Sequence, residues 1–220
     1  MTMQLYVIEG NIGAGKTLLT KLLAEKYNAK AVYEQFADNP FLPKFYKEPD
    51  RYAFPLELSF LADRYNQLKK ELAPDSADSL IISDYYFSKS LVFARKTLTD
   101  DEYNLYFKLF NLILNQLPKP TIYVYLHRST SELLKNIKKR GRDYEKSITA
   151  DYLKSIEEGY FDYLSQQTEF PVLIFECDKL DFENNREHLD FIDENIFCKH
   201  HEKGVKTISN VCSERSRSKQ

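Results

Sequence analysis

The sequence has few cysteines, no excess of charge of one sign and no long apolar run, and each absence excludes a class of protein. Its three cysteines, Cys177, Cys198 and Cys212, show no metal-ligand spacing, which favours reduced thiols over a disulfide framework. The 31 basic and 33 acidic residues give a formal charge of -2, which argues against binding nucleic acid as a polymer. No apolar segment approaches the roughly 18 residues that span a membrane, and the start lacks a signal-peptide pattern.

We therefore expect an intracellular, cytoplasmic protein without a membrane partner. The 220 residues, of which 43% are hydrophobic, suffice for one domain with a buried core. Apolar periodicity is lost from Lys199 onward, which predicts a domain over residues 1–198 and a polar, mobile tail over residues 199–220. His200 and His201 fall in this tail, and we expect them to be solvated and to have no functional role.

Short apolar runs alternate with amphipathic stretches along the chain, which predicts an α/β fold. The runs are continuous, as in strands that are buried on both faces of a parallel sheet. The five expected strands lie near residues 5–8, 31–33, 80–82, 122–126 and 172–175. The expected helices lie near residues 18–27, 54–73, 88–97, 100–116, 131–140 and 150–166. Thr99 and Glu102 form a capping box at the start of one of these helices.

The segment from Gly10 to Thr17 matches the phosphate-binding loop (P-loop) pattern G-x-x-x-x-G-K-[ST] between a predicted strand and a predicted helix. Glycines let the backbone curl so that its N–H groups and the helix N-terminus face phosphate oxygens. Lys16 can reach the β- and γ-phosphates of ATP, and the Thr17 hydroxyl can bind Mg²⁺. The predicted fold is a three-layer P-loop NTPase with a five-stranded parallel sheet. The predicted phosphate-binding residues of the loop are Gly10, Asn11, Ile12, Gly13, Ala14, Gly15, Lys16 and Thr17.

Two acidic residues, Glu34 and Asp84, each come at the end of a predicted strand. A parallel sheet presents the carboxyl ends of its strands to the ligand crevice. A carboxylate there can accept a proton from an attacking hydroxyl, so Glu34 is the predicted general base. We expect Asp84 to lie near Mg²⁺ and the attacking hydroxyl.

The basic run over residues 138–145 follows a predicted strand and helix. A charge run of this kind is usually a solvated helix end, but its place in the chain predicts an Arg-rich lid. Arg140 and Arg142 are suited to this role because the planar guanidinium binds phosphate oxygens in pairs and keeps its charge.

With these motifs the chain resembles the deoxynucleoside kinases over about residues 3–197. That resemblance implies transfer of the γ-phosphate of ATP, with Mg²⁺, to the 5′-hydroxyl of a deoxynucleoside in nucleotide salvage, by a homodimer. The segments that carry it are GNIGAGKT at 10–17, Glu34, FYKEPDRYAF at 45–54, KRGRDYE at 139–145 and Asp-Tyr-Leu at 151–153.

The resemblance also implies a role for each matching residue. Glu34 lies beside the 5′-hydroxyl, while Tyr46 and Glu145 hold the sugar 3′-hydroxyl. Arg64 belongs to the base pocket. The implied catalytic residues are Glu34, Asp84, Lys16 and Arg140, and the implied ligands of Mg²⁺ are Thr17 and Asp84.

The chain departs from the family at Glu57, where the family usually has Gln. An ionised carboxylate can only accept hydrogen bonds, which suits an amino-bearing base, and deoxyadenosine is the favoured substrate. Four other interpretations stay open: Glu57 is protonated when buried, a water intervenes, base recognition differs from that of the family, or the side chain points to the helix surface.

A second departure is Tyr85, which replaces the usual family Arg after the strand-end acid. The preferred alignment places Asp84 at the strand end, near Mg²⁺. A competing alignment makes Asp84 a base-pocket partner of Arg64. Loss of one cation that faces phosphate could cost about 3 kcal/mol of transition-state stabilisation, unless the lid arginines or Arg64 compensate.

Two alternative functions follow from these observations. One is a nucleoside-monophosphate kinase of the thymidylate kinase type, against which the missing arginine argues. The other is a catalytically impaired nucleotide-binding protein, which the changes at Glu57 and Tyr85 motivate. The apolar stretch from Leu105 to Leu117, with Phe107 and Phe110, is interpreted as either core or dimer interface.

Overall fold

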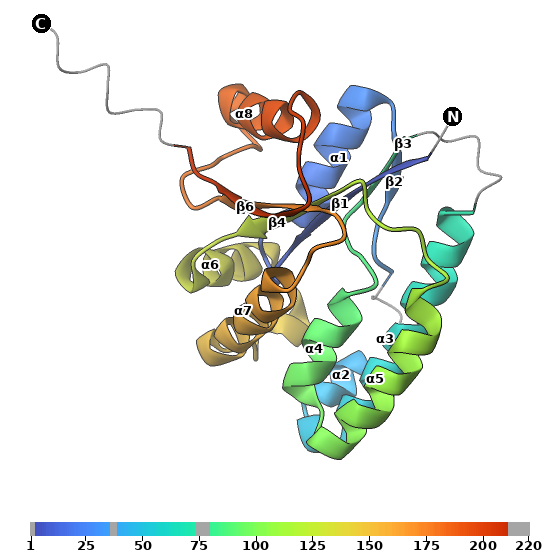
Figure 1. Cartoon of the computed structure of the whole chain (residues 1–220). Coiled ribbons are helices and arrows are strands. Elements are labelled where there is room, and N and C mark those ends of the chain that lie inside the picture. Colours follow the sequence, from blue (N-terminus) through green and yellow to red (C-terminus); the bar gives the residue numbers. More distant parts are fainter. Residues whose placement is uncertain (1–2, 36–38, 74–79, 211–220) are drawn as a thin grey trace, which may run out of the picture.

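The computed structural model describes residues 3–35, 39–73 and 80–210 of the chain. Over these residues it contains one parallel sheet of six strands in the order β2-β3-β1-β4-β5-β6 (Figure 1). The strands are β1 (Gln4–Gly10), β2 (Lys30–Val32), β3 (Leu80–Ser83), β4 (Ile122–His127), β5 (Pro171–Glu176) and β6 (Gly204–Ile208).

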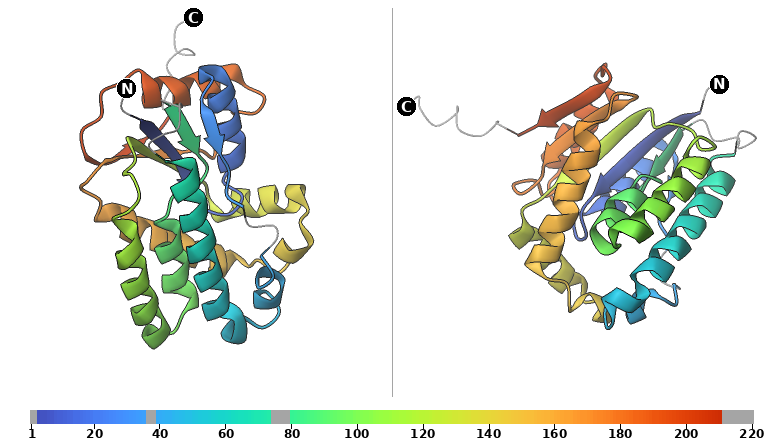
Figure 2. Two further views of the ribbon diagram at one scale, coloured as in Figure 1. Left: turned by 90° about the vertical axis from the view of Figure 1, so that its right-hand side faces the viewer. Right: turned by 60° about the horizontal axis from the view of Figure 1, so that its bottom comes forward.

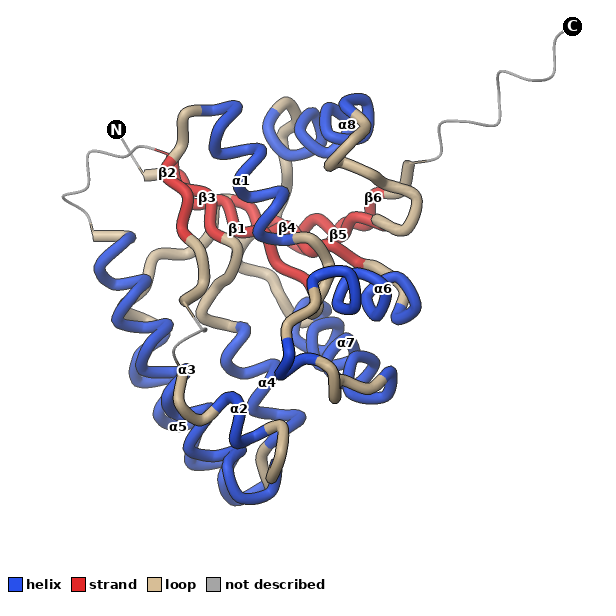
Figure 3. The backbone as a smooth tube through the Cα atoms, turned by 180° about the vertical axis from the view of Figure 1, so that it is seen from behind, coloured by secondary structure: helices blue, strands red, loops and turns tan. Residues whose placement is uncertain are grey.

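Helices cover both faces of this sheet and confirm the three-layer α/β prediction. Helices α1 and α8 lie on one face, while α3, α4, α5 and α7 lie on the other (Figures 2 and 3). The helices are α1 (Lys16–Tyr27), α2 (Leu42–Phe45), α3 (Pro49–Glu71), α4 (Lys89–Thr97), α5 (Asp100–Leu114), α6 (Thr130–Arg140), the 3₁₀ helix η1 (Asp143–Glu145), α7 (Ala150–Ser165) and α8 (Arg186–Phe197). In the part of the chain that the structure describes, none of the helices is long and apolar enough to cross a membrane.

The continuous apolar runs follow from the two cores that flank the sheet. Along β1, Leu5 and Val7 pack into the core beneath α3, α4, α5 and α7. The alternate residues Tyr6 and Ile8 pack into the core beneath α1 and α8. Because successive strand side chains point to opposite faces, a strand buried on both sides is apolar at every position.

The predicted helices are confirmed, with differences at their ends. Helix α3 begins at Pro49 rather than at residue 54. Proline suits a first helical position, since the N–H that it lacks would have no partner there. The capping box of Thr99 and Glu102 is present at the start of α5.

The predicted tail over residues 199–220 is corrected by β6. The residues from Gly204 to Ile208 pair in parallel with β5 and extend the predicted five strands to six. Of these residues only Ile208 is buried. An edge strand is held mainly by backbone pairing, so it needs no apolar run. His201 lies 2.7 Å from the Asn195 carbonyl through Nε2, and residues 211–220 lie outside the described residues.

The strand order reverses at β1, which places a ligand crevice at its carboxyl end. From β1 the chain builds β2 and β3 on one side, then crosses to β4, β5 and β6 on the other. Parallel sheets bind ligands where the strand order reverses in this way. The P-loop begins at this point, with Gly10 as the last residue of β1.

Removal of β6 should destabilise the domain. A chain that ends after His201 lacks β6, so the backbone edge of β5 is exposed. A chain that ends after Asn210 keeps β6, and the edge of β5 stays paired. We expect the shorter chain to have a free energy of unfolding lower by about 2–4 kcal/mol, mainly from lost burial of Ile208 and of the surface beneath it. Urea denaturation of the two chains measures the difference, and equal stabilities would contradict a structural role for β6.

Candidate active site

The P-loop conformation depends on two glycines in the left-handed region. Gly13 has φ 84° and Gly15 has φ 99°. A Cβ atom on Gly13 would lie 2.9 Å from the Leu133 carbonyl oxygen, and one on Gly15 would lie 2.9 Å from the Phe182 ring. Both positions therefore require glycine, for backbone strain and for space.

Side chains from distant segments hold the P-loop in place. The Asn11 amide donates to the Leu153 carbonyl (2.7 Å), and the Asn136 amide donates to the Gly13 carbonyl (2.9 Å). Arg128 donates to the Ala14 carbonyl (3.2 Å). Helices α6 and α7 are thus tied to the loop, which gives it a defined shape before any ligand binds.

Lys16 is folded against the P-loop backbone. Its Nζ donates to the carbonyls of Gly10 (2.8 Å) and Asn11 (3.0 Å). Burial, together with the nearby charge of Lys89, lowers the pKa of Lys16 to about 8. An ammonium held at the base of the loop is available to an anion that binds there.

Asp84 joins the P-loop helix to the end of β2. It follows β3 directly and accepts a hydrogen bond from the Thr17 hydroxyl (2.6 Å) through Oδ2. Its Oδ1 accepts from the Glu34 backbone N–H (2.7 Å). These contacts agree with the strand-end alignment, whereas the ion pair of Arg64 is with Glu34. A hydroxyl and one carboxylate at a helix start fit Mg²⁺, which favours few protein oxygens together with phosphates and water.

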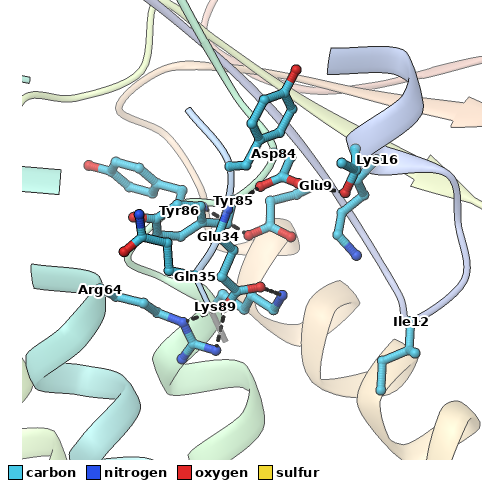
Figure 4. A network of polar contacts seen from close by, with 12 residues as sticks. Glu9, Ile12, Lys16, Glu34, Gln35, Arg64, Asp84, Tyr85, Tyr86 and Lys89 are labelled. Carbon is cyan, nitrogen blue, oxygen red and sulfur yellow. Dashed lines mark hydrogen bonds and ion pairs between the residues drawn. The ribbon is translucent and has the colours of Figure 1, made fainter. Parts of the chain in front are cut away.

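Glu34 is held between two cations (Figure 4). Arg64 Nη2 lies 2.8 Å from Glu34 Oε1, and Lys89 Nζ lies 2.5 Å from Glu34 Oε2. The three side chains are at most 9% exposed. Burial alone would raise the pKa of Glu34, but Lys89 and Arg64 outweigh it and lower this pKa to about 2. Glu34 is therefore ionised at neutral pH.

Lys89 is a site residue that sequence reasoning missed, and it bears on the departure at Tyr85. The Tyr85 hydroxyl donates to Gln67 (2.8 Å) and its ring lies in a hydrophobic core. The Tyr85 side chain thus points away from the site. The cation next to Glu34 is instead Lys89, five residues after Asp84. In the sequence, a lysine at the start of a helix is typical of a solvated surface, so no signal marked it.

Glu9 is a second buried carboxylate that sequence reasoning missed. It accepts from the backbone N–H groups of Tyr86 (3.0 Å) and Gly10 (3.3 Å) and from the Tyr160 hydroxyl (2.9 Å). Burial raises the pKa of Glu9, which the nearby Lys89 and Lys16 oppose. The residue joins the start of the P-loop to the segment after β3. A carboxylate inside an apolar strand was the signal that could have identified it.

The lid arginines are paired with the lid glutamate. Arg140 donates to both oxygens of Glu145 (3.0 and 2.5 Å), and Arg142 lies 3.5 Å from it. Glu145 is buried, although it comes from the short helix η1. Ligand phosphates could compete with Glu145 for these guanidinium groups.

Glu57 points into the interior, which overturns the interpretation of a surface carboxylate. It is buried on α3, and its Oε1 accepts from the Thr97 hydroxyl (3.0 Å). Burial raises the pKa of Glu57 to about 7, against the opposing effects of Arg64 and Thr97.

One cavity brings most of the predicted site residues together. Apolar side chains of Leu42, Phe45, Leu56, Phe60, Phe93 and Tyr152 line one part of it. The predicted site residues that line it are Ile12, Gly13, Lys16, Thr17, Glu34, Tyr46, Glu57, Arg64, Asp84, Arg140, Arg142 and Glu145.

A second cavity lies on the other side of the same P-loop. It shares Gly13, Lys16, Thr17 and Arg140 with the first cavity. Its other lining residues come from the P-loop and the start of α1, from Arg128 and α6, and from the segment 178–184. That segment carried no sequence motif and was missed. Two cavities that meet at a phosphate-binding loop suit a reaction between two ligands.

Comparison with known proteins decides the family. The family model described as "Deoxynucleoside kinase" matches residues 6–201. The chain belongs to the deoxynucleoside kinase family. The match favours this family over the thymidylate kinase alternative, and it makes the protein a kinase, that is, a phosphotransferase.

The matches to relatives of this kinase extend over most of this chain and most of each relative. A deoxyguanosine kinase of Bacillus subtilis is 36% identical over 189 residues, which cover 81% of this chain and 89% of the relative. A deoxyadenosine kinase of Lactobacillus acidophilus is 34% identical, with 88% of this chain and 96% of the relative covered. The solved structure of deoxyadenosine kinase from M. mycoides, with dCMP and dCDP bound, superposes with a TM-score of 0.76 at 22% identity. The superposition covers 89% of this chain and 100% of the M. mycoides chain, and it confirms the fold.

The Glu34 cluster should make the stability of this kinase depend on pH. Because the pKa of Glu34 is about 2 rather than its ordinary 4.5, the stabilisation is fully present above about pH 4.5 and is lost toward pH 2. The contribution should fall by about 1.4 kcal/mol per pH unit below about pH 4.5. Urea titrations give the free energy of unfolding of the wild type and of Glu34→Gln at each pH. The difference between the two isolates the contribution of Glu34. The control variant Glu25→Gln, at an exposed pair with Lys21, should show no such trend. A difference between wild type and Glu34→Gln that stays constant with pH would contradict the role of the cluster.

Proposed function

We propose that this protein transfers the γ-phosphate of ATP to the 5′-hydroxyl of a purine 2′-deoxynucleoside. The observation that carries the proposal is that Lys16, the Thr17–Asp84 pair and Glu34 line one cavity. Phosphoryl transfer needs mainly positioning and neutralisation of charge, which such a set of groups provides.

On the donor side, the P-loop would hold the phosphates of ATP. Lys16 would exchange its bonds to the loop carbonyls for bonds to phosphate oxygens, and Arg140 and Arg142 would turn from Glu145 to the transferring group. Thr17 and Asp84 would hold Mg²⁺. The ion held there would supply positive charge against the charge that develops on the phosphates during transfer.

On the acceptor side, Glu34 would orient the 5′-hydroxyl and accept its proton. A carboxylate with a pKa of about 2 is a weak base. Weak basicity is compatible with a loose transition state, in which the hydroxyl becomes acidic only as the new bond forms. Arg64 contacts Glu34 Oε1 through both Nε (2.9 Å) and Nη2 (2.8 Å), whereas Oε2 contacts Lys89. Oε2 therefore keeps a lone pair that can accept the hydroxyl proton. Tyr46 and Glu145 would hold the 3′-hydroxyl of the sugar.

The base would occupy the apolar part of the cavity. Phe45, Phe60 and Phe93 offer flat apolar surface to a planar ring, which suits burial of a purine. The names of the relatives include deoxyguanosine kinase and deoxyadenosine kinase. The preference for deoxyadenosine over deoxyguanosine stays a prediction.

Location and assembly also stay predictions. Cytoplasmic location fits a salvage kinase, and a homodimer could form through α5. The alternatives of core and interface both apply to this helix: Phe110 is buried, whereas Leu105, Phe107 and Leu112 are exposed.

Labelled ATP with Mg²⁺ and each deoxynucleoside or monophosphate tests the reaction. Product should form from deoxynucleosides, and Glu34→Gln should lower kcat by about 100-fold or more while ATP still binds. Product only from monophosphates would instead indicate a monophosphate kinase, and no product would indicate a nucleotide-binding protein. Near-normal turnover by Glu34→Gln would contradict its role.

Lys89 should matter for catalysis where Tyr85 does not. Lys89→Met leaves Glu34 with Arg64 alone and should lower kcat by about 10- to 100-fold, by analogy with loss of other charge-stabilising groups. Tyr85→Phe, the matched control, loses only a hydroxyl that bonds Gln67, and its kcat should stay within about twofold. Steady-state kinetics with circular dichroism as a folding check compares them. A larger loss in Tyr85→Phe than in Lys89→Met would contradict the assignment.

A further inference from the structure

Glu57 carries a buried oxygen atom that lacks a hydrogen-bond partner. Its carboxylate is on α3 and lines the cavity beside Leu56 and Phe60. Oε1 accepts from Thr97 (3.0 Å), but Oε2 has no partner among the described residues. Leaving a buried polar atom unpaired costs about 1–3 kcal/mol. An unpaired oxygen on a side chain that lines a ligand cavity points to a hydrogen bond that a ligand completes.

The Thr97 hydroxyl allows Glu57 to be either ionised or neutral. This hydroxyl lies 3.0 Å from Glu57 Oε1 and 3.0 Å from the Phe93 carbonyl oxygen, but it has one proton to donate. When the proton points to Glu57, it stabilises the carboxylate. When Glu57 is neutral, its proton can sit on Oε2, which has no partner among the described residues, while the Thr97 hydroxyl goes on donating to Oε1. The contact therefore persists in both states without movement of the backbone.

The two purine bases need opposite partners from this side chain. Guanine presents two neighbouring donors, N1–H and N2–H₂, whereas adenine presents the donor N6–H₂ beside the acceptor N1. An ionised carboxylate offers acceptors only and so matches guanine. A neutral carboxyl offers one donor and one acceptor and so matches adenine.

We propose that the charge of Glu57 selects the base, with the carboxylate holding guanine and the neutral carboxyl holding adenine. The proposal rests on the proposed function, in that the base of a purine deoxynucleoside occupies this cavity. Glu57 is then a specificity-determining residue whose preference changes with pH.

Two groups that line this cavity, Glu57 and Lys16, have pKa values near neutral pH. Lys16 lies at the P-loop, against the Gly10 and Asn11 carbonyls, so its titration should affect both nucleosides alike. Burial, opposed by Arg64 and Thr97, puts the pKa of Glu57 at about 7. Glu34 has a pKa of about 2, and burial raises the pKa values of Tyr106 and Tyr152 above their ordinary range. The charged and titratable groups that face Glu57 or line the same cavity are Lys16 on α1, Glu34 after β2, Tyr46 after α2, Arg64 on α3, Asp84 after β3, Lys89 on α4, Tyr106 on α5, Tyr152 on α7 and Arg140, Arg142 and Glu145 of the lid.

Competition between the two nucleosides tests the proposal. Deoxyguanosine and deoxyadenosine are mixed with the wild-type protein, ATP and Mg²⁺, and the two monophosphates are quantified between about pH 6 and about pH 8. The product ratio reports the ratio of kcat/KM values, so pH effects on ATP binding and on the transfer step cancel. The ratio of deoxyguanosine to deoxyadenosine product should rise by up to about 100-fold, since one charge state grows about tenfold while the other falls about tenfold.

Two variants separate the charge of Glu57 from other causes. Glu57→Gln carries a permanent donor and acceptor, so it should favour deoxyadenosine at every pH and give a flat ratio. Thr97→Val removes a donor to the carboxylate and should move the change to higher pH. Deoxyinosine, which keeps N1–H but lacks the N2 amino group, should gain less than deoxyguanosine as pH rises.

Each failure has its own signature. A wild-type ratio that stays constant, while both nucleosides are phosphorylated, overturns the role of Glu57 and leaves the proposed function intact. A pH dependence that persists in Glu57→Gln overturns it as well. Absence of product from every deoxynucleoside overturns the proposed function and, with it, this inference. The wild-type measurement needs no variant to fold.

Discussion

The site depends on the buried cluster in which Glu34 is shared by Arg64 and Lys89. Buried charges are costly unless they are paired, and removal of Glu34 would leave two cations facing each other. The cluster joins the end of β2 to helices α3 and α4. The backbone N–H of Glu34 donates to Asp84, and Asp84 also accepts from the Thr17 hydroxyl at the start of α1. Segments that are distant in the sequence thereby meet around one cavity, and the acceptor side is held in register with the P-loop.

The same cavity contains a second carboxylate in the opposite electrostatic situation. Glu34 has two cations in contact and a pKa of about 2, whereas Glu57 has one hydroxyl in contact and a pKa of about 7. Neighbouring carboxyl groups whose environments separate their pKa values can take different roles. Here Glu34, which is ionised at neutral pH, lines the cavity together with Lys16 of the P-loop. The group that can hold a proton lies in a part of the cavity lined by aromatic rings, where we propose that it distinguishes one base from another.

Much of the fold could be predicted because its physical causes are local or periodic. Continuous apolar runs marked five of the strands, the Thr99–Glu102 pair marked the start of α5, and the glycine spacing marked the P-loop. Strand β6 was missed because an edge strand needs backbone partners rather than apolar side chains. Lys89 was missed because a lysine at a helix start has the same local pattern whether it is solvated or buried against a carboxylate.

The sequence by itself determined the P-loop, the three-layer fold and the acidic strand ends, since each follows from residue type and spacing along the chain. Only the tertiary structure decided that Tyr85 turns into the core, that Lys89 joins Glu34, and that Glu57 faces the cavity rather than the surface. The physical reason is that these outcomes depend on burial and on charges brought from other segments. A residue's neighbours in sequence determine neither its burial nor the distant charges around it. Burial and these charges together decide whether a carboxylate is ionised.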